Sequence, residues 1–344
     1  MDLKQIDWKR IAKPQPDAYD SHIIATILYE KYGWKKITPT SELTFCNGTV
    51  GIAEDKLEWA ESLQHGSLWR PTNTFWGSGI DHMTPELTAT IDRFLMAWPD
   101  GSLMLQNFLD EYWPKWSGQM STYARGSSSG HIIMAHGAQL NPPVGGVILN
   151  AVYVTANDPQ GCSAGTYHEV GHARLESIGI DIDKHDNQLL LNTPDELYDS
   201  PVRWDVKRPM SAVVQGVYSW IMLSEADLQC GLNLTGWDTK NPDIQVSPAE
   251  ATAGYLIGNI PKIEDGLAEI RTHAKLTPEG VAFMDGYLEW GEDLVSRALP
   301  FLKETLGDRF DTEYDKAKEY RSRRLLELQA NEDAKRADQA AVTP

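Results

Sequence analysis

Two histidines four residues apart, His168 and His172, form the pattern in this chain that most directly indicates metal chemistry. On a helix, this spacing puts both imidazoles on one face, one turn apart, where they can chelate a single ion. Glu169 lies between them and completes a His-Glu-x-x-His motif. In zinc proteases such a glutamate is the general base acting on metal-bound water, and in other metal enzymes it supports the site as a neighbouring polar group. The motif therefore predicts a metal centre with Glu169 as its catalytic carboxylate.

Two histidines do not complete a metal site, because a third protein ligand is usual and further positions stay open for substrate. The metzincin pattern would need a histidine at position 178, where this chain has Ile178. His185 lies in a polar stretch that is typical of a loop. Glu225, on a later predicted helix, is the carboxylate alternative used by gluzincins. The residues alone leave both candidates open.

The motif needs a helix to hold it, and residues from about 163 to 178 predict one, with Gly179 as its C-cap. Gly171 and Ala173 are small enough to allow a neighbouring element to approach this helix closely. The segment 145–155 is rich in Val and Ile and predicts a strand just before the helix. Strand and motif together indicate a small sheet beside the metal-binding helix.

Most other patterned segments predict helices, at 20–32, 84–98, 102–116, 211–228, 248–272 and 276–298, with one long charged helix from Lys303 onward. The predicted fold class is thus α+β and predominantly helical, with a small sheet next to the His-Glu-x-x-His helix. We expect a mainly helical region at 1–120, a metal-binding catalytic region at 121–300, and a charged helix and tail at 301–344. The three regions can also form one compact domain.

Three segments, read in order, carry a resemblance to a known family. They are His168–His172, the segment 195–203 with its Ser-Pro-x-Arg block, and Arg208-Pro209-Met210 leading into the helix at 213–228. The strand at 146–155 and the turn after it fit the same family. Over about residues 120–230 the chain resembles a bacterial His-Glu-x-x-His family of iron- and 2-oxoglutarate-dependent peptide β-hydroxylases, which modify ribosomal peptide natural products.

The resemblance implies Fe(II) as the metal and 2-oxoglutarate as the co-substrate. Arginine binds carboxylates bidentately through its planar guanidinium group, so Arg203 and Arg208 are the candidates for holding the co-substrate. Similar proteins place a histidine at the start of the later helix as the third metal ligand. This chain has Gln215 there, and its carbonyl oxygen can also ligate.

The substrate implied by the resemblance is a peptide or amino acid, including a ribosomal precursor peptide, that is oxidised at a C–H bond. Trp204, Tyr218 and Trp220 are the aromatic candidates for the substrate side of the site, although core packing is a common fate of such residues.

Two other functions stay open. A zinc metallopeptidase would use Glu169 as the base and Glu225 as the third ligand. The other alternative is a binding protein with a degenerate metal site. Gln215 favours this hypothesis, because an amide is a weaker ligand than an imidazole.

Composition narrows the class of partner. The formal net charge of −18 argues against nucleic acid and against anionic membrane surfaces. The three cysteines are far apart and form no Cys-x-x-Cys pair, so we expect a reducing, cytoplasmic setting. The first residues carry no apolar signal core, and no run of 18 apolar residues predicts a membrane span.

Overall fold

The structure is a computed structural model of the 344-residue chain. It describes residues 6–17, 23, 41–45, 48–52, 93–111, 117–121, 129–134, 149–155, 159–180, 189–202, 206–234, 247–319, 322, 326, 329 and 330. The described part is mostly helical with small sheets, so the predicted class, predominantly helical α+β, is confirmed.

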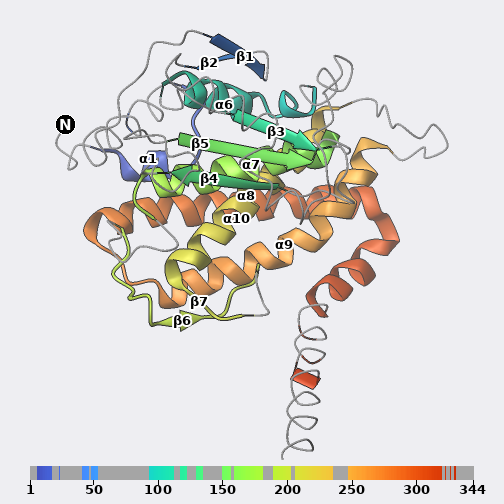
Figure 1. The fold of residues 1–344 in the computed structure, drawn as a ribbon. Helices are drawn as coiled ribbons and strands as arrows, with labels where there is room; N and C mark the ends of the chain where they lie inside the picture. Colours follow the sequence, from blue (N-terminus) through green and yellow to red (C-terminus); the bar gives the residue numbers. More distant parts are fainter. Residues whose placement is uncertain are drawn as a thin grey trace, which may run out of the picture.

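The helices dominate the described part of the chain (Figure 1). They are α1 (Trp8–Ile11), α6 (Pro99–Glu111), α7 (Pro159–Ser177), α8 (Met210–Asn233), α9 (Pro248–His273), α10 (Pro278–Leu306) and the short 3-10 helix η4 (Gly307–Arg309).

A three-stranded mixed sheet lies beside α7, in the order β3-β5-β4. In it β5 (Leu149–Thr155) pairs in parallel with β3 (Ser117–Ser121) and antiparallel with β4 (Ser129–Met134). Two hairpin-like pairs complete the strands. They are β1 (Ser41–Phe45) with β2 (Gly48–Ile52), and β6 (Leu197–Tyr198) with β7 (Arg208–Pro209).

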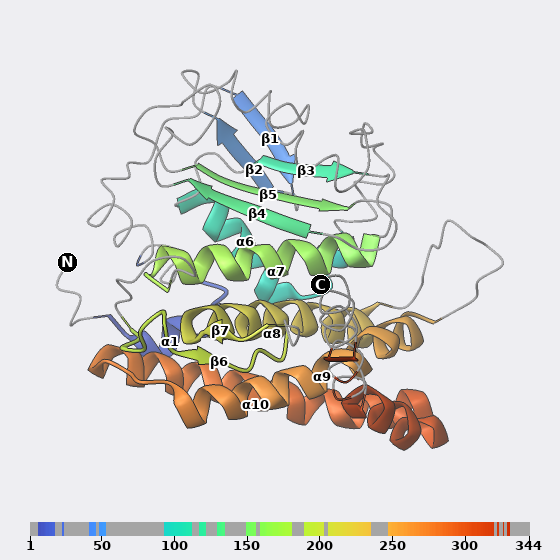
Figure 2. The ribbon, with the colours of Figure 1, turned by 60° about the horizontal axis from the view of Figure 1, so that its bottom comes forward.

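The elements stack in layers, which Figure 2 shows from the sheet downward. Strands β4 and β5 pack on α7, α7 packs on α8, and α8 packs on α9, which in turn contacts α10. Helix α7, which carries the motif, therefore lies between the small sheet and the helical layers. The small sheet expected next to this helix is confirmed.

Local sequence signals explain where the helices begin and end. Ser247 caps α9 through a capping box with Glu250, and Thr277 caps α10 by accepting from the backbone of Gly280. At the end of α7, Gly179 has a φ of 95°, and the backbone N–H of Ile180 donates to the carbonyl of Leu175. This is a Schellman closure, and it confirms Gly179 as the predicted C-cap.

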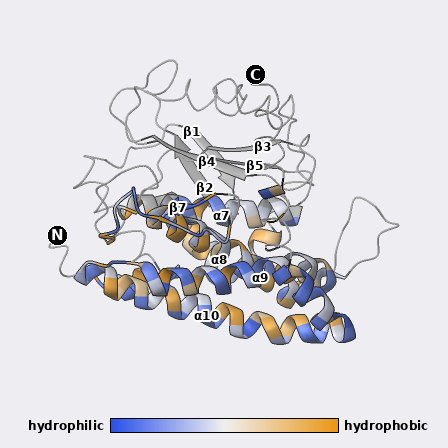
Figure 3. Ribbon diagram, turned by 90° about the horizontal axis from the view of Figure 1, so that it is seen from below, coloured by the Kyte–Doolittle hydropathy of each residue, from blue (hydrophilic) through white to orange (hydrophobic). Residues whose placement is uncertain are grey.

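One apolar core joins helices α1, α7, α8, α9 and α10. Helix α8 is buried along most of its length because neighbours cover several of its faces. Polar and apolar residues alternate along α9 and α10, as expected for helices with one buried face (Figure 3).

Several boundaries differ from the sequence prediction. Strand β5 covers Leu149–Thr155, and residues 145–148 of the predicted strand lie outside the described residues. The charged C-terminal helix is not continuous from Lys303, because α10 ends at Leu306 and Gly307 adopts a φ of 54° before residues 310–319 resume as helix. Glycine accepts this left-handed conformation, so it ends the helix here. Among the described residues, no helix is both long and apolar enough to cross a membrane.

Candidate metal centre

The motif face of α7 lies directly against α8 because glycine leaves room there. A Cβ atom at Gly171 would lie 3.0 Å from Cγ of Met222 and 3.3 Å from Cα of Ser219. The two helices run antiparallel, with Gln160 near Asp227 at one end and His172 near Gln215 at the other. The close approach allows side chains of α8 to reach the histidines of α7.

His168 and His172 converge through the same ring nitrogen. Their Nε2 atoms lie 3.2 Å apart, and the two rings meet edge to face with centroids 4.8 Å apart. Two imidazole nitrogens bound to one metal ion at about 2.1 Å would be separated by roughly 3.0–3.4 Å, for octahedral or tetrahedral angles. The observed spacing thus fits two ligands of a single metal ion.

The side-chain amide of Gln215 contacts one histidine of this pair, His172. Its amide nitrogen donates to the carbonyl of Ile180 at 2.5 Å, and its Oε1 lies 2.8 Å from Nδ1 of His172. A carbonyl can only accept, so the contact with Ile180 fixes the amide with its oxygen toward His172. Nδ1 of His172 must then carry the proton, which leaves the lone pair of Nε2 directed at His168. This is the tautomer that binds a metal through Nε2.

The sequence prediction made Gln215 itself a metal ligand. In the structure, its carbonyl oxygen is engaged by His172 on the side of the ring away from Nε2. Gln215 therefore lies as a hydrogen-bond partner of His172 and not where a metal held by the two Nε2 atoms would be, because α8 brings its amide to Nδ1.

Glu169 lies where the motif predicts a working carboxylate. It is only 4% exposed, and its Oε1 lies 3.7 Å from Nε2 of His168. A metal held by Nε2 would thus be next to a buried carboxylate that can hold a proton or orient a bound water.

A cavity of about 340 Å³ opens beside His168, between α7, α8 and α9. Small residues of α7 make room for it, and the residues that give it chemical character are His168, Trp220, Asp227, Tyr255 and Asn259. The Trp220 ring stands edge-on to His168 with centroids 6.3 Å apart, and Nζ of Lys262 lies 4.1 Å from the centroid of the Trp220 ring. The cavity is therefore aromatic next to His168, and a lysine packs on that aromatic ring.

Tyr218 does not lie on the substrate side as expected, whereas Trp220 lines the cavity. Tyr218 is fully buried, stacks on Tyr287 with centroids 5.5 Å apart, and its hydroxyl accepts from Nε of Arg174 at 3.1 Å. Residues two apart on a helix point about 200° away from each other, so only one of the two can face the cavity. Tyr218 belongs to the core.

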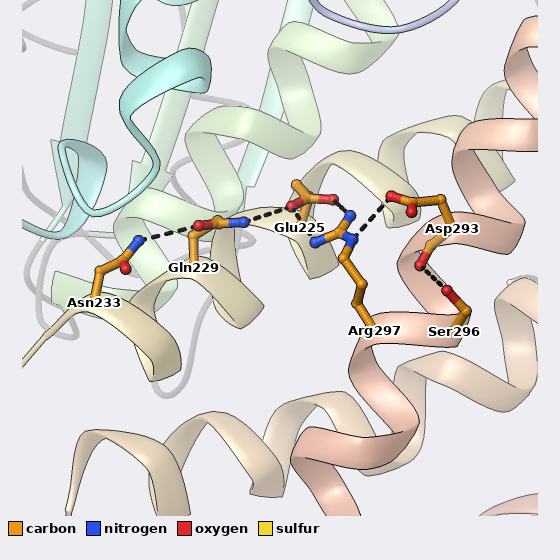
Figure 4. Close-up of polar contacts among 6 residues, drawn as sticks. All are labelled: Glu225, Gln229, Asn233, Asp293, Ser296 and Arg297. Atoms are coloured by element: carbon orange, nitrogen blue, oxygen red, sulfur yellow. Dashed lines mark hydrogen bonds and ion pairs between the residues drawn. The ribbon is translucent and has the colours of Figure 1, made fainter.

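Glu225, the carboxylate considered for a zinc peptidase, is committed elsewhere. Both of its oxygens accept from Arg297 of α10, at 2.9 and 2.5 Å, and Gln229 donates to it at 2.9 Å (Figure 4). A carboxylate held bidentately by a guanidinium is not available as a metal ligand. Within the part of the chain that the structure describes, no three His, Cys, Asp or Glu residues gather as a metal-binding group.

The other predicted residues are only partly placed. Arg208 lies in β7, opposite Tyr198 of β6, and it precedes α8 on the side of Gln215 away from the cavity. Arg203, Trp204 and His185 lie outside the described residues.

The sequence prediction missed the contribution of α9 to the cavity. Tyr255 and Asn259 line it, and Lys262 follows on the same helix. Their spacing of four and three residues marks one helical face, and this polar stripe was the available signal. What the sequence could not indicate is that this face meets Trp220.

Comparison with known proteins adds no relative. No family model matches the chain, and no curated protein matches it significantly.

Proposed function

We propose that this protein is a non-haem Fe(II)- and 2-oxoglutarate-dependent oxygenase that oxidises a C–H bond of a peptide or amino acid. The observation that carries the proposal is the 3.2 Å approach of the Nε2 atoms of His168 and His172, with the tautomer of His172 fixed by Gln215. The resemblance in the segments 168–172, 195–203 and 208–228 supports the choice of iron and 2-oxoglutarate.

The donor set fits this metal. Imidazole nitrogen is an ordinary ligand of Fe(II), and a site that keeps several positions open suits an oxygenase, whose co-substrate chelates the metal. Bound iron, with 2-oxoglutarate and oxygen, supplies the oxidising power that no side chain offers. His168 and His172 would supply part of the first coordination shell, and among the described residues no group of three His, Cys, Asp or Glu side chains gathers as a metal site.

The chain's own residues do the remaining work. Glu169 holds a buried carboxylate beside His168 and can keep a proton or a water in place there. The Trp220 ring closes one side of the cavity next to His168 and excludes water from it. We propose that the substrate, a peptide such as a ribosomal precursor, enters from this cavity in the cytoplasm.

A zinc peptidase is the second candidate, and the position of Glu169 favours it, since a buried carboxylate beside the metal suits a general base. It lacks the third ligand that was expected for it, because Glu225 pairs with Arg297.

An anaerobic optical titration tests the proposal. Metal-stripped protein receives Fe(II) and then 2-oxoglutarate, and we expect a visible charge-transfer band that needs both additions and is lost in His168→Ala. Metal binding without a band, together with peptidase activity that is lost in Glu169→Gln, would support the zinc enzyme instead. Protein that binds no metal would be a binding protein with a degenerate site.

A further inference from the structure

At the end away from His168, the cavity has a buried carboxylate, that of Asp227 on α8. Asp227 lines the cavity and is only 2% exposed. Its Oδ1 accepts a hydrogen bond of 2.9 Å from the amide nitrogen of Gln160, which also donates to Oγ1 of Thr252 at 3.2 Å. Helices α7, α8 and α9 thus each contribute one side chain to this end, and the hydrogen bonds between them hold the carboxylate in place.

The negative charge of Asp227 acts in a part of the molecule that is poor in water. Burial raises the pKa of the nearby Cys230 thiol, and the charge of Asp227 raises it further. Lys and Arg are absent from the described residues that line the cavity, so its walls do not repel a cationic ligand. A cation stabilises a buried carboxylate, and a cationic group is therefore the ligand that this end favours.

Between Asp227 and His168, the described residues that line the cavity have small or apolar side chains. They are Gly161, Ala164, Gly165, Trp220 and Leu223. Gln160, which holds Asp227, lies eight residues before His168 on α7, roughly 12 Å along the helix axis. A lysine side chain carries its ammonium on a four-carbon stem, so the ammonium can lie at Asp227 while the first carbons of the stem stay nearer to His168.

Helix α9 adds an aromatic ring near Asp227. Tyr255 lines the cavity one turn after Thr252, which shares the amide donor of Asp227. The face of an aromatic ring attracts an ammonium group. Asn259 lines the cavity one turn further along α9, and its amide can bond a peptide group of the substrate.

We propose that Asp227 binds the side-chain ammonium of a lysine residue in the peptide substrate. This inference rests on the proposed oxygenase function and names the residue that is oxidised, since the stem of a lysine bound in this way runs along the cavity toward His168. The formal net charge of −18 attracts a basic peptide over longer distances. A glutamate side chain would be repelled by Asp227 at the same place.

Anaerobic calorimetric titration of the full chain, with Fe(II) present, tests this assignment with capped tripeptides. Glycine flanks a central lysine, a norleucine, which has a similar stem without the ammonium, or a glutamate. We expect wild type to bind the lysine peptide on the order of 10- to 100-fold more tightly than the norleucine peptide, as one charged hydrogen bond implies. Asp227→Asn keeps an acceptor for Gln160 and should remove this preference, while its affinity for the norleucine peptide stays unchanged.

Asp293→Asn is the matched control, because it also neutralises one aspartate, but one that pairs with Arg297 on α10. It should keep the preference for lysine. Equal affinity of wild type for the lysine and norleucine peptides, or a preference that survives in Asp227→Asn, would overturn the inference. An uncapped norleucine peptide that binds as tightly as the capped lysine peptide would also overturn it, because the ammonium recognised would then be an amino terminus.

The same titrations on metal-free protein separate this inference from the proposed function. A lysine preference that depends on Asp227, in protein that takes up no iron, would support the cation site while the oxygenase function fails. A charge-transfer band with Fe(II) and 2-oxoglutarate, but no lysine preference, would support the oxygenase and overturn the cation site.

Discussion

At the scale of single residues, Gln215 has a clear structural role. It connects the end of α7 to the ring of His172, because its amide nitrogen donates to the carbonyl of Ile180 while its oxygen faces Nδ1 of His172. The C-cap at Gly179 sets where that carbonyl lies. The end of α7 therefore fixes the tautomer of His172, which lies five residues before the last residue of this helix.

Replacing Gln215 should weaken metal binding without removing a ligand. Gln215→Leu deletes the acceptor for Nδ1 of His172, and we expect metal affinity to fall about 10- to 100-fold, as is usual for the outer partners of ligating histidines. Gln215→Glu keeps an acceptor for Nδ1 but loses the donor to the carbonyl of Ile180, so we expect its affinity to lie between those of wild type and Gln215→Leu. Competition with a metal chelator measures both, and Gln215→Leu that binds metal as tightly as wild type would contradict the role assigned to the amide.

Lys262 should cost stability, because burial partly desolvates its ammonium group in the folded protein. Lys262→Met keeps the apolar stem and removes the desolvated charge, so we expect the free energy of unfolding to rise by about 0.5–1 kcal/mol at pH 7. The pKa of Lys262 is lowered in the folded protein, so its cost is full where the lysine is charged in both states. The gain should therefore shrink as pH rises through the lowered pKa and vanish above the unfolded value of 10.5.

Urea unfolding of wild type and variant at several pH values measures this difference. A gain that is independent of pH would show that packing, and not the charge, explains it.

Whether a contact of the site could be predicted from the sequence depends on how far apart its residues lie along the chain. His168 and His172 could be predicted because four residues on a helix define a face. The partner of His172 lies 43 residues away, on another helix, and only the packing of α7 on α8 reveals it. Lys262 shows the same limit more strongly, since its contact with Trp220 depends on how α8 and α9 cross.

At the scale of elements, α9 packs closely on α8 at Gly266. This contact lies one turn from the place where Lys262 of α9 meets Trp220 of α8. A Cβ atom at Gly266 would lie 2.3 Å from Cγ2 of Val217, whereas a Cβ atom at Gly258 of the same helix would meet nothing within 4 Å. Close packing at one position and open space at the other give a matched pair of substitutions.

Gly266→Ala should lower the free energy of unfolding by about 1–3 kcal/mol, because the two helices must separate or the valine must leave its rotamer. Gly258→Ala should be neutral or stabilise by up to about 1 kcal/mol, because alanine favours the helix. Denaturant unfolding of both variants checks this. Equal effects of the two substitutions would mean that α9 does not pack on Val217.

A partly buried ion pair links α8 to α10 (Figure 4). Glu225 is 5% exposed at its side chain and is held by Arg297, which also pairs with Asp293. Arg297→Met leaves that carboxylate buried and unpaired, so we expect a loss of about 2–4 kcal/mol in the free energy of unfolding. Arg271→Met breaks the exposed pair with Glu292 and should cost less than about 1 kcal/mol. Thermal unfolding of both variants distinguishes these magnitudes, and a small loss for Arg297→Met would contradict the burial of Glu225.

Elements with strong local signals could be predicted, and the others could not. A few adjacent residues determine the capping box at Ser247 and the proline after Thr277. The predicted helices at 248–272 and 276–298 therefore start within two residues of α9 and α10. The break at Gly307 was missed because the surrounding residues are charged and favour helix, and one glycine decides the backbone.

At the scale of the whole molecule, the candidate metal centre lies where the small sheet and the helical layers meet. The sheet covers one side of α7, while α8 and α9 close the other and form the cavity. The core runs through α1, α7, α8, α9 and α10, so the histidines stand on an element that is held from two sides. A site built this way is positioned by packing, which keeps the ligand geometry fixed before any metal binds.

The central claim is that His168 and His172 hold one metal ion, and equilibrium dialysis of the metal-stripped full chain against Fe(II) without oxygen tests it most directly. We predict one ion bound per chain, none retained by His168→Ala or His172→Ala, and wild-type binding by His273→Ala, whose ring lies against Tyr198 at the surface. Binding that survives in both His168→Ala and His172→Ala, or wild-type protein that takes up no ion, would contradict the account.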